Sequence, residues 1–190
     1  MIYRAPGVGK TSILNSLIIP ILEDQFEIPP VVRVGLGRAA IISDQMMTAI
    51  HNIYVFSVLQ RLAPNVDPTL LMKYTFCQFL NDYFPPKVDR LGREIPPIIV
   101  FDQLEELFEF YPERWLAQQE DFFTQIADAL NGDPDLGIVL VIREDHLAHL
   151  DHFASILPEK LKIRFRLEPL HKDAALAADT ASSCLSETME

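Results

Sequence analysis

The stretch RAPGVGKTS, residues 4–12, combines a glycine-rich turn with a lysine and two hydroxyl residues that follow it directly. Apolar residues recur with a 3.6-residue period over residues 11–22, which predicts an amphipathic helix that opens at the lysine–threonine pair. A glycine turn before a helix leaves backbone N–H groups free for phosphate oxygens, and the helix dipole strengthens their binding. The stretch therefore predicts a phosphate-binding loop.

Nucleotide chemistry suggests a role for each part of this loop. Lys10 is expected to reach the β- and γ-phosphates and Thr11 to place its hydroxyl on Mg²⁺, while the glycines allow close backbone approach. Arg4 departs from the pattern GxxxxGK[ST], because it stands where the first glycine is usually found. An ordinary glycine-containing turn is the alternative interpretation. The predicted nucleotide-binding residues are Gly7, Val8, Gly9, Lys10, Thr11 and Ser12.

A second motif is IIVFD, residues 98–102, an apolar run that ends in an acid. A phosphate loop needs a carboxylate at the end of a neighbouring buried strand to help hold Mg²⁺, and Asp102 has that position. Glu105 and Glu106 follow closely and are predicted to orient or deprotonate the attacking water. The alternatives are that Asp102 only caps a helix and that the two glutamates form a solvated face.

Arg143 directly follows a third apolar run, LGIVLVI, residues 136–142. A cation at the tip of the strand beside the Asp102 strand can contact a γ-phosphate and report its presence. The alternative is a surface ion pair with Glu144 or Asp145. Loop, acid and sensor would meet at the carboxyl edge of a parallel sheet, where open α/β sheets bind ligands.

The remaining pattern predicts an α/β fold. Further strands are expected at residues 31–35 and 163–170, and helices at residues 46–62, 69–84 and 115–130. Helices that alternate with continuous apolar strands indicate a mostly parallel sheet covered on both faces. The first strand, before the loop, is reduced to MIY and is largely missing.

Composition argues against several other classes of protein. The net charge of −11 disfavours binding to nucleic acid or to an anionic membrane surface. The longest apolar runs are far shorter than the roughly 20 residues that cross a bilayer, and no secretory signal pattern is present. We therefore expect a cytoplasmic protein with a nucleotide as its partner, and neither nucleic acid nor membrane.

Two weaker signals concern the identity of the ligand. His146, His149 and His152 recur every three residues, but on one helix they would not converge tightly on a metal ion. No NKxD sequence follows a strand, so guanine specificity is not indicated. The expected cofactors are ATP and Mg²⁺.

Several segments together carry a family resemblance: GVGKTSILNSLIIPIL, VVRVG, NIYVFSVLQRL, IIVFDQLEELF, YPERW, VIREDHLAHLD and ILPEKLKIRFRLEPL. The chain resembles the bacterial novel STAND NTPases, which are related to NACHT and apoptotic ATPases, from about residue 5 to residue 178. The resemblance implies a three-layer ASCE-type P-loop domain that binds and slowly hydrolyses ATP. It also implies a switch that controls opening and self-association of a larger signalling or defence protein.

The resemblance assigns the same roles by position. Gly9, Lys10 and Thr11 take the phosphate and Mg²⁺ roles and Asp102 the Mg²⁺ role. Either Glu105 or Glu106 would activate water, and Arg143 would act as the sensor.

The chain departs from the family at its two ends, because the family has a longer first strand and continues into helical and winged-helix domains. We therefore expect a nucleotide domain cut at both ends over residues 1–178, followed by a polar, disordered tail at 179–190. Two alternatives stay open: a truncated fold that does not bind nucleotide, and a stand-alone P-loop ATPase or kinase.

Overall fold

The computed structural model describes residues 1–4, 10–35, 49–109 and 112–167. Within them, five mutually parallel strands form one sheet in the order β2-β5-β6-β1-β7. This arrangement confirms the predicted parallel α/β architecture. The strands are β1 Ile2–Arg4, β2 Val32–Arg33, β5 Ile98–Asp102, β6 Gly137–Arg143 and β7 Phe165–Arg166.

The first strand is as short as the sequence predicts, yet it lies between two partners. Ile2 is in register with Val141 of β6 on one side and with Phe165 of β7 on the other. The two edge strands are also shorter than expected. Of the strand expected at residues 31–35 only β2 is formed, and of the strand expected at residues 163–170 the described part contains only β7. The sheet is therefore longest at β5 and β6.

Strand β5 supplies side chains to both faces of the sheet. All five of its residues are buried, which explains why it reads as a continuous apolar run. Ile99 and Phe101 pack into the larger hydrophobic core, whereas Ile98 and Val100 pack into a smaller one on the opposite face. This alternation follows from the two-residue period of a strand.

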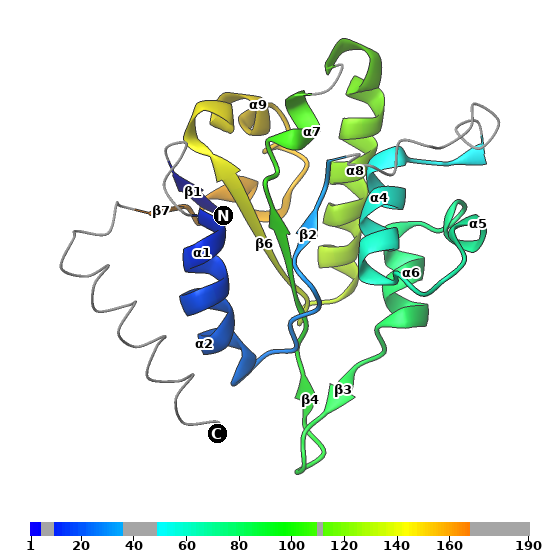
Figure 1. Cartoon of the computed structure of the whole chain (residues 1–190), viewed down its shortest axis with the longest axis vertical. Coiled ribbons are helices and arrows are strands. Elements are labelled where there is room, and N and C mark those ends of the chain that lie inside the picture. The colour runs from blue at the N-terminus through cyan, green and yellow to red at the C-terminus, as the bar shows by residue number, and fades with distance from the viewer. Residues whose placement is uncertain (5–9, 36–48, 110–111, 168–190) are drawn as a thin grey trace, which may run out of the picture.

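Helices cover both faces, so the domain has three layers (Figure 1). One face carries α1 Lys10–Ile13, a π-helical segment Leu14–Ile18 and α2 Ile19–Glu23. The other face carries the larger set of helices. They are α4 Ile53–Leu62, α5 Pro68–Leu71, α6 Phe76–Tyr83, α8 Pro112–Gly132 and α9 Leu147–His152. The short α7, Glu106–Glu109, follows β5.

Two predicted helices need correction. The helix expected at 46–62 is interrupted: Ala49 is helical, residues 50–52 are not, and residues 46–48 lie outside the described ranges. The helix α4 starts afresh at Ile53, because the Asn52 side chain accepts hydrogen bonds from the N–H groups of Tyr54 and Val55. The helix expected at 69–84 is two helices, because Thr75 starts α6 with a capping box. The helices expected at 11–22 and 115–130 are confirmed, the first with its π-helical interruption and the second as the longer α8.

An antiparallel hairpin was not predicted. Its strands are β3 Lys87–Val88 and β4 Glu94–Ile95, and they project from the body of the domain below β5 (Figure 1). The strands are too short and too polar to give a two-residue hydrophobic alternation. None of the described helices is long and apolar enough to span a membrane.

Candidate functional site

The carboxyl ends of the central strands bring the predicted site residues to one edge of the sheet. Arg4 at the end of β1 is in register with Arg143 at the end of β6, and Asp102 at the end of β5 is in register with Arg33 of β2. The helix that begins at Lys10 starts beside the end of β5, because Thr11 in its first turn is hydrogen-bonded to Asp102. Thr11, Asp102 and the end of β6 at Arg143 therefore lie at one edge of the sheet, whereas residues 5–9 of the predicted loop lie outside the described residues.

The hydroxyl of Thr11 donates a hydrogen bond of 2.7 Å to Oδ2 of Asp102, a residue 91 positions further along the chain. Asp102 is only 1% exposed, and its Oδ1 accepts a second hydrogen bond of 2.9 Å from the N–H of Gln103. A hydroxyl and a carboxylate are hard oxygen ligands of the type that Mg²⁺ prefers. The pair therefore fits the metal role predicted for both residues.

The rest of the phosphate loop is described only in part. Gly7, Val8 and Gly9 lie outside the described residues, as does the side chain of Lys10. Ser12 is exposed in the first turn of the helix, and its carbonyl accepts a hydrogen bond from Ser16. Among the described residues, no group of three or more His, Cys, Asp and Glu side chains could hold a metal ion.

A sharp turn after β5 places the acids that follow Asp102. Gln103 adopts a left-handed backbone conformation with φ of 57°, and the N–H of Leu104 donates to the carbonyl of Val141 in β6 at 3.0 Å. Leu104 and Leu107 are fully buried, so the segment is anchored over the neighbouring strand. This anchoring holds Glu105 and Glu106 at the edge of the sheet.

Glu105 lies on the β6 side of this turn. Its Oε2 accepts a hydrogen bond of 3.2 Å from the backbone N–H of Arg143, and the residue is 6% exposed. Glu105 therefore contacts the end of β6, whose other neighbour in the sheet is β1.

Glu106 lies on the opposite side, against the end of β2. It packs so closely on Gly35 that a methyl group there would lie 1.9 Å from its carboxylate. The Gly35 carbonyl also accepts hydrogen bonds from Arg61, at 2.9 Å, and from Ser57, at 3.2 Å. Burial raises the pKa of Glu106, and the charges of Arg33 and Arg61 oppose that rise. The two glutamates therefore occupy different surroundings.

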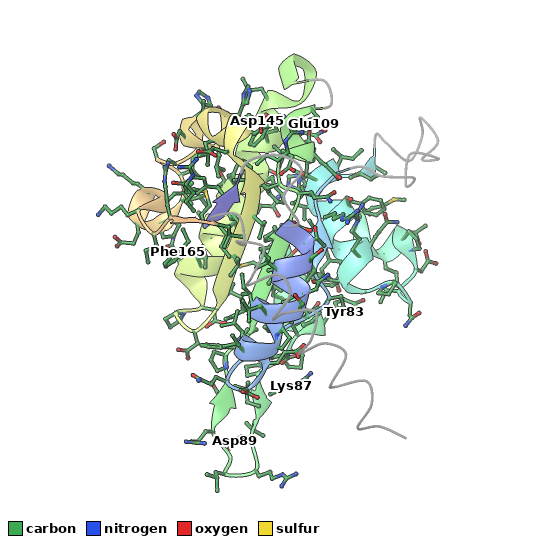
Figure 2. The ribbon with its side chains drawn as sticks, turned by 60° about the vertical axis from the view of Figure 1, so that its left-hand side comes forward. Tyr83, Lys87, Asp89, Glu109, Asp145 and Phe165 are labelled. Atoms are coloured by element: carbon green, nitrogen blue, oxygen red, sulfur yellow. The ribbon has the colours of Figure 1, made fainter. Side chains whose placement is uncertain are left out.

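Arg143 engages two carboxylates with its side chain. Its Nε and Nη2 donate to Asp145 at 3.1 and 2.5 Å, and its Nη1 donates to Glu109 at 3.4 Å. These hydrogen bonds lower the pKa of Asp145. Figure 2 shows Asp145 and Glu109 together at the same end of the molecule. The ion pair with Asp145 foreseen as the alternative to a sensor is present, whereas Glu144 pairs with Arg166.

Sequence reasoning missed the group that surrounds Glu106. The segment VVRVG, residues 31–35, was predicted only as a strand, although its Arg33 and Gly35 both lie near Glu106. Arg61 belongs to a helix that packs on β2, so its contribution depends on tertiary structure rather than on a local motif. The three histidines serve in packing and pairing: His149 stacks on Phe108, His152 contacts Phe153, and His146 lies 3.8 Å from Glu109.

Comparison with known families gives one match. Residues 1–178 match the family described as Novel STAND NTPase 1. No curated protein and no solved structure matches the chain. Because the match covers most of its length, the chain belongs to the Novel STAND NTPase 1 family.

Proposed function

We propose that this member of the Novel STAND NTPase 1 family binds Mg·ATP at the carboxyl edge of its sheet and hydrolyses it slowly. We further propose that nucleotide binding serves as the switch of a signalling or defence protein that self-associates in its longer form. The observation that carries the proposal is the contact between Thr11 and buried Asp102.

The contact joins the two protein groups that hold Mg²⁺ in P-loop NTPases, a hydroxyl at the start of the loop helix and a carboxylate at a strand end. Such sites need few protein ligands, because Mg²⁺ keeps several waters and takes its other ligands from phosphates. Mg²⁺ would supply charge neutralisation between the β- and γ-phosphates. Thr11 and Asp102 would hold the ion, and Lys10 would contact the phosphates.

Glu105 is the better candidate for activating water. Its hydrogen bond from the Arg143 N–H fixes its orientation at the end of β6, the strand next to β1. Glu106 instead packs against Gly35 beside Arg61, where it supports the end of β2. We therefore assign Glu105 as the base and Glu106 as a positioning residue.

Arg143 is proposed as the sensor. Its guanidinium is shared between Asp145 and Glu109, which compete with any phosphate for the same donors. A bound γ-phosphate would draw Arg143 away from these carboxylates, and loss of the γ-phosphate would return Arg143 to them. A two-state switch requires such a difference in contacts between its two states.

Calorimetry with Mg·ATP tests the binding site. Thr11→Val and Asp102→Asn should each weaken binding by at least about tenfold in the presence of Mg²⁺, whereas Thr11→Ser, which keeps the hydroxyl, should bind like the unsubstituted chain. Lys10→Ala should weaken binding with or without Mg²⁺. If the folded, unsubstituted chain shows no saturable binding, the proposal fails and the fold acts without nucleotide.

Hydrolysis under single-turnover conditions separates the two glutamates. Glu105→Gln should lower the rate by about 10²- to 10⁴-fold while nucleotide binding persists. Glu106→Gln should have a much smaller effect on the same rate. The reverse order would show that Glu106 is the base. Transfer of phosphate to a small acceptor, rather than to water, would favour a kinase.

A further inference from the structure

The hairpin of β3 and β4 exposes an apolar tip at the opposite end of the domain from the nucleotide site. Figure 2 shows Lys87 and Asp89 on this projection, far from Glu109 and Asp145. Val88 is 61% exposed and Leu91 is 78% exposed, the largest exposure of any bulky apolar side chain in the described residues. A two-stranded hairpin is marginally stable by itself, so this projection needs a specific reason to hold its shape.

The tip is held in shape by Asp89. Its Oδ1 accepts hydrogen bonds from the N–H groups of Leu91, at 2.8 Å, and Arg93, at 2.9 Å. Its Oδ2 accepts another from the Arg93 side chain at 2.8 Å, and Gly92 provides the positive φ of 76° that closes the turn. Leu91 is therefore presented from an ordered turn, which lowers the conformational entropy lost on binding.

The tip also carries a cation, Arg90, with no ion-pair partner among the described residues. Lys87 pairs with Glu27 and Arg93 with Asp89, but Arg90 is exposed and makes no ion pair with the described residues. The tip thus presents an exposed leucine beside an exposed arginine. A surface complementary to this leucine and arginine would be apolar and would carry carboxylates.

Such a surface lies at the base of the same hairpin. A cavity of about 410 Å³ opens at the amino ends of β5 and β6, between α6, the end of α8 and β4. Its volume lies within the range of binding pockets. Its apolar walls include Leu80, Phe84 and Ile95, and its lining contains no lysine or arginine among the described residues. The carboxylates of the lining belong to Glu94, Asp133 and Asp135.

We propose that the hairpin tip, residues 90–92, docks into this cavity of a second copy of the chain. Leu91 matches the apolar walls, and Arg90 matches the carboxylates of Asp133 and Asp135. The tip cannot enter its own cavity, because the cavity is lined by the opposite end of the same hairpin. The contact lies away from the proposed nucleotide site, so it does not depend on nucleotide binding, and it names one surface for the self-association that is part of the proposed function.

The contact is small and joins two different surfaces. Two copies can exchange tips reciprocally, or successive copies can associate head to tail. A single tip buries far less area than a stable dimer, so association of the isolated domain is weak and becomes visible at high protein concentration. In a longer protein held together elsewhere, the same contact would be strengthened by effective concentration.

Sedimentation velocity from low micromolar to submillimolar protein tests the proposal. The unsubstituted chain should self-associate, and Leu91→Asp on the tip or Asp135→Lys at the cavity should each weaken association by at least about tenfold. Matched controls are Leu70→Asp, at another leucine that is 59% exposed, and Glu120→Lys, at an exposed acid on α8; neither should change association. Thermal melting of each variant checks that its fold is kept.

Mixing the variants gives the sharpest result. Leu91→Asp keeps an intact cavity and Asp135→Lys keeps an intact tip, so a mixture of the two should associate more strongly than either variant alone. A chain that stays monomeric at every concentration overturns the proposal. Loss of association in the controls, or no rescue on mixing, overturns it as well.

Discussion

The two faces of the sheet are covered very differently. On one face, β5 contributes Ile99 and Phe101 to a core shared with α4, α6, α8 and α9. On the other, Ile98 and Val100 meet Leu14 of the phosphate-loop helix in a cluster with few fully buried members. The helix that carries Thr11 thus rests on the thinner layer, while most of the buried apolar residues belong to the core on the other face. The difference suggests that stability and nucleotide positioning can be disturbed separately.

The largest effect is expected from Phe101→Ala, which opens the thicker face. Phe101 is fully buried, with its ring 6.2 Å from that of Phe76 and 6.0 Å from that of Phe122. Its loss leaves a cavity among rigid aromatic rings and should lower the free energy of unfolding by about 3–5 kcal/mol, measured by urea denaturation. The molecules that remain folded should bind nucleotide almost normally. A matching loss of affinity would show that the two faces are coupled.

A smaller loss of stability is expected from Leu14→Ala, on the thinner face. Leu14 is 1% exposed, but it packs beside partly exposed neighbours that can close around the gap. The free energy of unfolding should fall by about 2–3 kcal/mol, at the lower end for a buried leucine. Nucleotide affinity should fall as well, because Leu14 fixes the helix that carries Thr11. An unchanged affinity in calorimetry would contradict the role assigned to this face.

The smallest effect concerns Glu106, and it appears as a pH dependence. Burial raises its pKa from the ordinary value of 4.5, so the folded protein holds this proton more tightly than the unfolded chain. The contribution to stability is greatest at low pH and is lost as pH rises from 4.5 through the raised pKa. Glu106→Gln should therefore gain stability relative to the unsubstituted chain across this window. Urea unfolding at several pH values measures the difference, and a constant difference would show that the carboxyl titrates normally.

Local signals were sufficient for part of the fold. Strand β5 is buried along its whole length and β6 is buried over residues 140–142, so their apolar runs could be recognised directly, and α8 has a long helical period. The position of Asp102 followed from its place at the end of such a run. The sequence also indicated that Asp102 and Thr11 would lie near each other, because the carboxyl ends of parallel strands share one edge of the sheet.

The remainder depends on contacts that no local pattern encodes. The surroundings of Glu106 arise where α4 packs on β2, so Arg61 carried no signal in the sequence. The break between α5 and α6 depends on the capping box at Thr75. The apolar pattern of this segment would also suit one longer helix, so the pattern alone did not reveal the break. The hairpin has strands of two residues, below the length at which periodicity is informative.

The position of β1 has a consequence for synthesis of the chain on the ribosome. Its partners at Val141 and Phe165 are made more than a hundred residues later, so at roughly 5–20 residues per second the strand waits on the order of ten seconds. Protease protection of ribosome-arrested chains of increasing length should show β1 protected only after β6 has emerged. Protection of shorter chains would contradict this order. Of the described strands of the sheet, β1 would thus be synthesised first and yet be among the last to find its partners.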